Sequence, residues 1–154
     1  MSDFKVYIQE CDKNGGSGTN TKDIEKDFNV TGGKLLYKEC KGLNDVGKVM
    51  NVYTETYHDS NKIRVHVPEK VFHEPTTITL TLLFVGDERA KVKDSFDNFI
   101  IQGFHKYWDT VRKKAFVFYI ADEIPVGEEM SKGSEKYMVC SYKLKNIQGK
   151  TTDV

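Results

Sequence analysis

The chain has 154 residues, with 23 Lys and Arg against 23 Asp and Glu, so its formal net charge is +0. This length suits one domain with a single hydrophobic core, and a neutral chain has no overall field that would attract nucleic acid or an acidic membrane surface. Only Arg64, Arg89 and Arg112 carry guanidinium groups, the side chains best suited to contact phosphates and base edges, so we expect no specific nucleic-acid readout.

The start of the chain and its cysteines bear on location. Met1 to Glu10 contains charged residues and lacks the apolar core of a signal peptide, and no apolar run reaches the length of a membrane span. Three cysteines, Cys11, Cys40 and Cys140, are odd in number and far apart, which favours free thiols in a reducing compartment. We therefore expect a protein that is cytoplasmic when synthesised and has no membrane partner.

The first predicted strand ends near Cys11, after Val6 and Ile8 alternate with polar neighbours. The chain from Asp12 to Thr31 is polar and rich in glycine, and it can bury little apolar surface. Loops of this length are unusual inside compact domains. We expect a flexible glycine-rich loop or arm at about residues 12–33, which is either a linker or a segment that becomes ordered on a partner.

Period-two alternation predicts further strands before the middle of the chain. The clearest strand places Ile78, Leu80, Leu82 and Phe84 on one face and threonines on the other. Leu83 and Val85 interrupt the polar face near the end of this strand, which predicts that this end is covered on both faces. The expected strands are Leu35 to Cys40, Asn51 to Tyr57, Lys62 to Val67 and Thr76 to Val85.

One helix is expected, at about residues 87–102. Gly86-Asp87-Glu88 offers an N-cap and an acidic first turn, and Gly103 is a suitable terminator. The apolar residues between them recur at helical spacing, so this face should pack against a sheet. These residues are Val92, Phe96, Phe99 and Ile100.

After the helix, two strands are expected at Phe104 to Trp108 and Lys114 to Ala121. The second is apolar on both faces and should be central in its sheet. Asp122 to Ser134 is predicted to be an exposed loop, Glu135 to Leu144 the last strand, and the tail from about residue 147 frayed.

These elements predict one domain over residues 1–154, of the mainly β (α+β) class. Because strands predominate and one helix has a single apolar face, we expect an antiparallel β-sandwich or a partly closed barrel with one flanking α-helix.

Metal and cofactor sites have weak sequence support. The three cysteines and His58, His66, His73 and His105 supply metal-ligating atoms, but no two are spaced as in structural zinc sites. The glycine-rich segments lack the lysine and the strand-to-helix position of a phosphate-binding loop. We expect no metal and no cofactor.

Catalytic groups are also hard to find in the sequence. No nucleophile has a supporting local motif such as G-x-S-x-G. His66 and His105 are expected to face solvent, and the carboxylates Glu88, Asp94 and Asp97 to lie on the exposed side of the helix. We therefore expect no catalytic residue.

Aromatic and charged residues after the helix are the best candidates for contacts. Trp108 is the only tryptophan, and large aromatic side chains dominate both cores and interfaces. A core or interface role is therefore expected for it. The candidate contact residues are Tyr53, Tyr107, Trp108, Asp109 and Arg112.

Four segments between Gly42 and Asn146 share a pattern and an order with a known group of proteins: Gly47 to Glu55, Pro75 to Phe84, Gly103 to Arg112 and Lys132-Gly133-Ser134. In these segments the chain resembles small virion-assembly proteins of prophages, a group with tail-tube, tail-completion and distal-tail subunits. The resemblance implies a β-sandwich with a flanking helix, whose subunits join side by side into a hexameric ring and carry no catalytic residues. It also implies that the partners are further copies of this chain and other tail proteins, in a virion or tail assembly.

Ring formation is consistent with the expected fold, because pairing between subunits satisfies the unpaired edges of an open sheet. Two alternatives remain. The first is a peptide- or carbohydrate-binding module that uses Trp108, Tyr107 and Tyr53. The second is a small hydrolase that uses His66 or His105, which predicts a shifted histidine pKa and a deep polar pocket.

Overall fold

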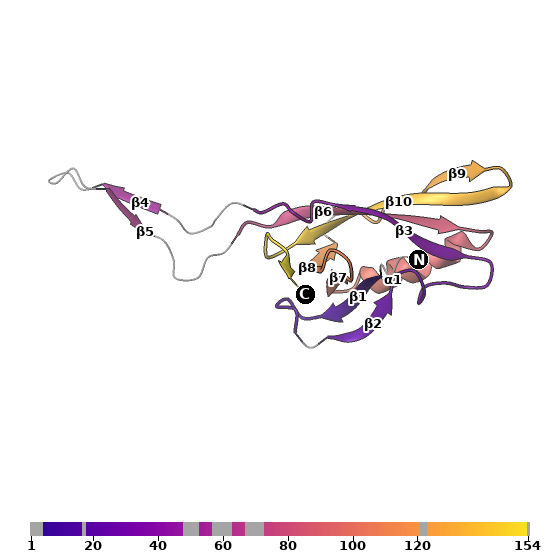
Figure 1. The fold of residues 1–154 in the computed structure, drawn as a ribbon, viewed down its shortest axis with the longest axis horizontal. Helices are drawn as coiled ribbons and strands as arrows, with labels where there is room; N and C mark the ends of the chain where they lie inside the picture. The colour runs from indigo at the N-terminus through magenta and orange to yellow at the C-terminus, as the bar shows by residue number, and fades with distance from the viewer. Residues whose placement is uncertain are drawn as a thin grey trace.

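The computed structural model describes residues 5–16, 18–47, 53–56, 63–66, 73–120 and 123–153; for 53–56, 63–66 and 153 it describes the backbone alone. Its elements follow one another along the chain in the order shown by the colours of Figure 1. They are β1 (Val6–Cys11), β2 (Thr19–Asp23), β3 (Lys34–Lys41), β4 (Tyr53–Thr56), β5 (Ile63–His66), β6 (Thr76–Val85), α1 (Arg89–Ile100), β7 (Phe104–Asp109), β8 (Lys114–Ile120), β9 (Glu128–Lys132), β10 (Glu135–Asn146) and β11 (Thr152–Asp153).

Within these ranges, nine strands form one antiparallel sheet in the order β2-β1-β7-β8-β10-β6-β3, to which β9 is added beside β10 and β11 beside β8. The sheet is not closed. The predicted mainly β, antiparallel fold with one flanking helix is confirmed. Strand β8 lies between β7 and β10, as its two apolar faces predict.

The single sheet bends so that its two halves lie on opposite sides of the core. Figure 1 shows β10, β6 and β3 above, β1 and β2 below, and α1 close to both. The bend is at the junction of β8 and β10, which pair only from Leu144↔Ile120 to Asn146↔Phe118. The halves thus face each other as the layers of a sandwich do, although they belong to one sheet.

Helix α1 packs into the space between the two halves. Its buried residues are Val92, Phe96 and Ile100, and the facing row of β6, Ile78 to Phe84 on alternate positions, is 0 % exposed. The helix is shorter at both ends than predicted. Glu88 occupies the N-cap position without a side-chain cap hydrogen bond, so the expected capping role of Gly86-Asp87-Glu88 is not realised by a side chain.

The expectation of a flexible arm at about residues 12–33 is corrected, because this segment packs on the sheet of its own chain. Strand β2 pairs with β1, and Ile24 and Phe28, in the turns that follow, are 0 % and 3 % exposed. Short polar side chains order the glycine-rich part: Asp12 Oδ1 accepts hydrogen bonds from the backbone N–H groups of Asn14 and Gly16 at 2.8 and 2.9 Å. Such local bonds stabilise turns without any apolar pattern in the sequence.

Two further expectations, an exposed loop at 122–134 and a frayed tail from 147, are also corrected, because both segments contain a strand. Strand β9 forms a hairpin with β10, and β11 pairs with β8. Thr151 Oγ1 donates a hydrogen bond to the carbonyl of Leu43 at 3.0 Å, which holds the tail against the chain after β3.

Strands β4 and β5 form a separate two-stranded sheet, which stands apart from the main sheet in Figure 1. The chain leaves the main sheet for this hairpin and returns to it at the same place. There His73 Nδ1–H donates to the Gly47 carbonyl at 2.9 Å, and the Gly47 N–H donates to the Gly149 carbonyl at 2.7 Å. We call these three residues the neck of the hairpin.

Candidate functional site

Four of the five predicted contact residues lie at the end of β7 and in the turn that leads to β8. Tyr107 and Asp109 are 0 % and 1 % exposed, whereas Trp108 is half-buried and Arg112 is exposed. The structure therefore differs from the expectation that Tyr107 and Asp109 lie on a contact surface. The fifth residue, Tyr53, lies in β4 opposite His66, and its side chain is outside the described part of the structure.

Asp109 fixes the β7–β8 turn. Its Oδ1 accepts hydrogen bonds from the backbone N–H of Arg112 at 2.6 Å and of Lys113 at 3.2 Å. Its Oδ2 lies 3.3 Å from Arg112 Nε. A buried carboxylate is stable only with such partners, and Lys113 has a φ of 54°, a conformation that these bonds help to hold.

Arg112 links this turn to β3, on the other half of the sheet. Its Nη2 donates to the hydroxyl of Tyr37 and, at 3.3 Å, to the hydroxyl of Tyr107. The guanidinium carbon also lies 5.9 Å from the centre of the Tyr37 ring. The cluster of Tyr37, Tyr107, Asp109 and Arg112 thus joins the two halves of the bent sheet through side chains.

The raised pKa values of the hydroxyl and thiol groups in and beside the cluster argue against nucleophilic chemistry there. Burial raises the pKa of the Tyr107 hydroxyl far above its usual value, and burial also raises the pKa of Tyr37. The nearby Cys40 thiol has its pKa raised by burial to about 12, against the lowering effect of Arg112. All three groups remain protonated at neutral pH, and a thiol in that state is a poor nucleophile.

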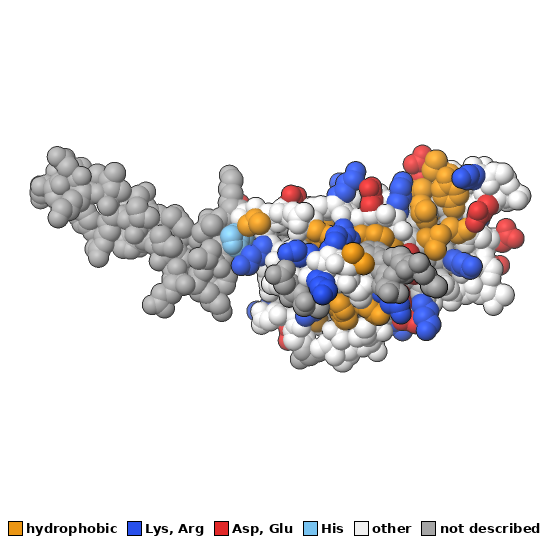
Figure 2. All heavy atoms as spheres, viewed as in Figure 1, with side chains coloured by type: hydrophobic (Ala, Val, Ile, Leu, Met, Phe, Trp, Pro, Cys, Tyr) orange, Lys and Arg blue, Asp and Glu red, His pale blue; other side chains and the backbone are white. Residues whose placement is uncertain are grey.

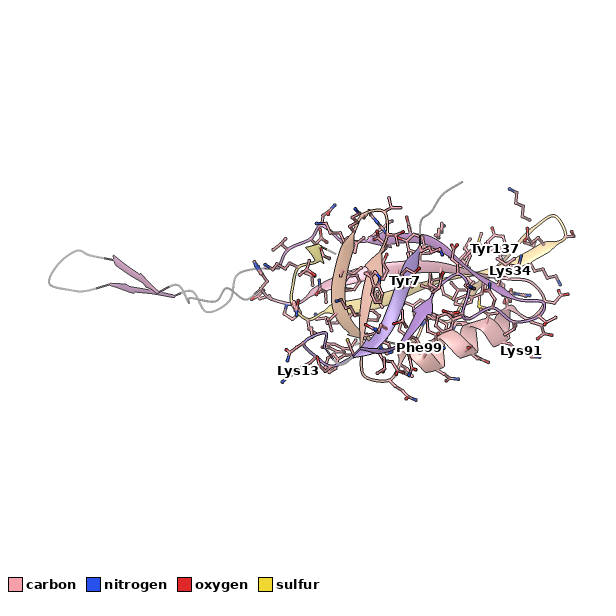
Figure 3. All side chains as sticks on the ribbon, turned by 60° about the horizontal axis from the view of Figure 1, so that its bottom comes forward. Tyr7, Lys13, Lys34, Lys91, Phe99 and Tyr137 are labelled. Atoms are coloured by element: carbon pink, nitrogen blue, oxygen red, sulfur yellow. The ribbon has the colours of Figure 1, made fainter. Side chains whose placement is uncertain are left out.

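Trp108 is on the outer face of the sheet. Its ring stacks on that of Tyr7, the residue opposite in β1, with centroids 5.4 Å apart and an angle of 24° between the planes. Figure 3 labels Tyr7 on this strand. The stacked pair is a core-like contact at the surface, intermediate between the two roles expected for Trp108.

His105 is not solvent-facing as expected: it is 0 % exposed. Its ring lies 4.9 Å from that of Phe99 in α1 and 5.8 Å from that of Phe118 in β8. Neither ring nitrogen has a hydrogen-bond partner of good geometry in the described part of the chain. Burial lowers the pKa of His105, against the raising effects of Glu10 and of backbone groups at Phe99 and Gly103.

Asp97 also differs from the expectation of a solvated helix face. Its Oδ1 accepts a hydrogen bond from the Tyr142 hydroxyl at 2.6 Å, and its Oδ2 lies 2.6 Å from Lys93 Nζ. The Asp97 side chain is only 15 % exposed. It therefore ties α1 to β10 and is not a free carboxylate.

Two cavities lie at the surface of the described part of the structure. One, of about 220 Å³, lies between the start of β1, the turn after β2 and Tyr37. The other, of about 440 Å³, lies beside Cys40 and Arg112, with Asp45 and Lys114 in its wall. Among the described residues, no three His, Cys, Asp or Glu side chains are grouped to hold a metal ion. No helix in the same residues is long and apolar enough to cross a membrane.

Comparison with known proteins adds no family: no protein-family model matches the chain, and no curated protein matches it in sequence.

Proposed function

We propose that the protein is a non-enzymatic structural subunit that acts by self-association into a ring, as a component of a phage tail or a related tube-like assembly. The β4–β5 hairpin, which forms a sheet of its own, is the observation that carries the proposal. The sequence resemblance to prophage tail-assembly proteins agrees with it. In this proposal the subunit is made in the cytoplasm and its partners are further copies and other tail proteins.

An isolated two-stranded hairpin is at best marginally stable in water. The register pairs Thr54 with Val65 and Thr56 with Ile63, and all four residues have β-branched side chains, which favour strands. Strands of this composition gain stability when they pair or pack with further strands. The corresponding hairpins of neighbouring subunits are suited to supply them, because they are identical and, among the described residues, pair with no other strand.

The edges of the main sheet differ in how well they could pair with a neighbour. The outer edge of β3 is already occupied, because Leu35 N–H donates to Asn29 Oδ1 at 3.0 Å and Tyr37 N–H donates to Glu25 Oε1 at 2.8 Å. Strand β2 is interrupted by a register shift opposite β1 and by Asn20, whose φ is 52°. Both features discourage pairing at an edge. The hairpin is therefore a better candidate than β2 or β3 for the contact that closes a ring.

Native mass spectrometry and negative-stain electron microscopy of the full chain over a range of concentrations test this proposal. We expect closed rings of more than two subunits. The double variant Ile63→Lys with Val65→Lys should abolish them, because it places charges in the hairpin where β-branched residues favour association. The matched control is Arg64→Lys, which keeps the charge on the same strand and should keep the rings.

Two results would count against the proposal. The first is a wild-type chain that never exceeds a dimer at high concentration. The second is an Ile63→Lys, Val65→Lys variant that forms rings as readily as the wild type.

A further inference from the structure

We propose that the outer face of the sheet, where β9, β10, β6 and β3 run side by side, binds the same face of a second copy of this chain. Opposite residues in antiparallel strands share a face. One row across the four strands runs Met130–Tyr137–Val85–Lys34, and the next runs Glu128–Val139–Leu83–Leu36. We call the six apolar members the outer apolar patch: Leu36, Leu83, Val85, Met130, Tyr137 and Val139.

None of these six side chains is buried by the chain itself. Leu36 is 38 % exposed and Met130 is 44 % exposed, and the other four are half-buried. Figure 2 shows hydrophobic side chains gathered at this end of the molecule between basic and acidic ones, and Figure 3 labels Tyr137 and Lys34 there. Contiguous apolar surface of this kind marks interaction sites on proteins that are otherwise polar outside.

The patch is confined to one end of the outer face. Farther along the same strands, the outward positions are polar, with Thr81 opposite Ser141 and Thr79 opposite Lys143. The inward face is apolar from Ile78 to Phe84 in β6 and from Met138 to Leu144 in β10, where it forms the core. The apolar end therefore has no role in the core of its own chain, which explains why Leu83 and Val85 interrupt the threonine alternation.

Strand β9, which carries one side of the patch, is held in place from the other face. Arg89 at the start of α1 reaches Glu129 of β9, with Nη2 and Nε at 2.6 and 2.9 Å from Oε2, and its Nη1 donates to the Gly86 carbonyl at 3.0 Å. Glu129 alternates with Met130, so this ion pair fixes the strand with Met130 outward. A surface that is fixed before binding loses less conformational entropy in forming a complex.

Charge at the corners of the patch favours a second copy as the occupant. Lys34 ends one row at β3, and Glu128 begins the next row at β9, so the two lie at diagonally opposite corners. Both are exposed, and neither has an ion-pair partner among the described residues. In a face-to-face pair whose two-fold axis lies in the plane of the contact and is perpendicular to the line from Lys34 to Glu128, Lys34 of each copy lies over Glu128 of the other, while apolar residues meet between them.

Sedimentation velocity over a concentration series tests this contact, in the wild type and in the Ile63→Lys, Val65→Lys background that removes association through the hairpin. We expect a dimer in that background. Leu36→Glu should weaken it by at least about tenfold, because it puts a charge in the apolar contact. Thr77→Glu, an exposed residue on the same face of β6 outside the patch, should leave the dimer unchanged.

A charge exchange identifies the occupant. Lys34→Glu and Glu128→Lys alone should each weaken the dimer by about tenfold, since each creates two like-charge contacts, and the double variant should recover most of the affinity. Circular dichroism checks that every variant is folded. A monomer at all concentrations in the hairpin background, or single variants whose losses add in the double variant, would overturn the proposal while leaving ring formation by the wild type open to its own test.

Discussion

At the scale of single residues, His105 is unusual among the side chains that the structure describes. A fully buried imidazole between Phe99 and Phe118, without a well-formed hydrogen bond to either nitrogen, is stable only in its neutral form. Its lowered pKa has the consequence that the unfolded chain binds a proton more readily than the folded chain.

Acid should therefore destabilise the protein through this residue. As the pH falls below about 6.5, the usual value for an exposed histidine, the unfolded state takes up a proton that the folded state does not, and the free energy of unfolding decreases until the pH passes the lowered pKa of the folded state. His105→Phe, which fits between the same rings, should remove this decrease. Urea unfolding at a series of pH values between 7 and 4 measures the difference between variant and wild type.

The control is His73→Gln, because His73 is outside the core. This variant should keep the acid-dependent loss of stability that the wild type shows. If His105→Phe and the wild type lost stability in parallel over this pH range, His105 would not be the group responsible.

The sequence could not have indicated the burial of His105. It alternates correctly within β7, but its neighbours Phe104 and Lys106 give no sign of which face is inward. The sequence could not indicate the contacts of Asp97 either, because a carboxylate on the surface of a helix is normally solvated. Its structural role depends on the Tyr142 hydroxyl of β10, which donates a hydrogen bond to it. Two of the candidate contact residues, Asp109 and Arg112, do lie together, but the contacts that the structure shows are with each other and with other residues of the chain.

At the scale of elements, α1 is held between the two halves of the sheet by one residue in particular. The ring of Phe96 lies 5.1 Å from Phe28, 6.3 Å from Phe84 and 5.1 Å from Tyr142, measured between centroids. These partners come from the turn after β2, from β6 and from β10. One side chain thus connects three segments that are distant in the sequence.

Phe96→Ala should cost about 3–5 kcal/mol of unfolding free energy, because it removes a buried ring and leaves a cavity between layers that cannot close. Lys91→Ala, on the exposed side of the same helix, should cost less than about 0.5 kcal/mol. Chemical denaturation followed by circular dichroism measures both. A loss below about 1 kcal/mol for Phe96→Ala would mean that the helix is not packed as described.

Alternation and helical spacing located the elements whose apolar pattern is strong. Strand β6 has the predicted bounds, and β3, β7, β8, β10 and α1 differ by a few residues at their ends. Strands β2, β9 and β11 were missed because they lie at the edge of the sheet, where polar side chains on both faces are tolerated. Their formation depends on the partner strand and not on a pattern of their own.

At the scale of the whole molecule, the neck of the hairpin depends on a glycine near the end of the chain. Gly149 has a φ of 71°, and a Cβ added there would lie 2.2 Å from the Glu74 carbonyl oxygen. At Gly149 the tail therefore contacts both the segment that leads into the hairpin, at Gly47, and the segment that returns from it, at Glu74. The tail thus holds the base of the hairpin in place as well as adding strand β11 to the sheet.

Gly149→Ala should open the neck. Gly133→Ala is the matched control, since Gly133 has a φ of 64° and nothing within 4 Å of an added Cβ. Both variants should lose about 1 kcal/mol for the left-handed backbone, and Gly149→Ala should lose clearly more because backbone atoms must move. Hydrogen exchange at the Gly47 amide should become faster only in Gly149→Ala; equal exchange in the two variants would show that the tail does not clamp the neck.

The neck also makes the molecule modular. Strands β3 and β6 are neighbours in the sheet, and the chain between them departs and rejoins at Gly47 and His73, which touch. An insert whose ends already meet can be exchanged for one of another length without altering how the host folds. Evolution, or an engineer, can therefore graft a different projection onto this scaffold while every residue of the core stays in place.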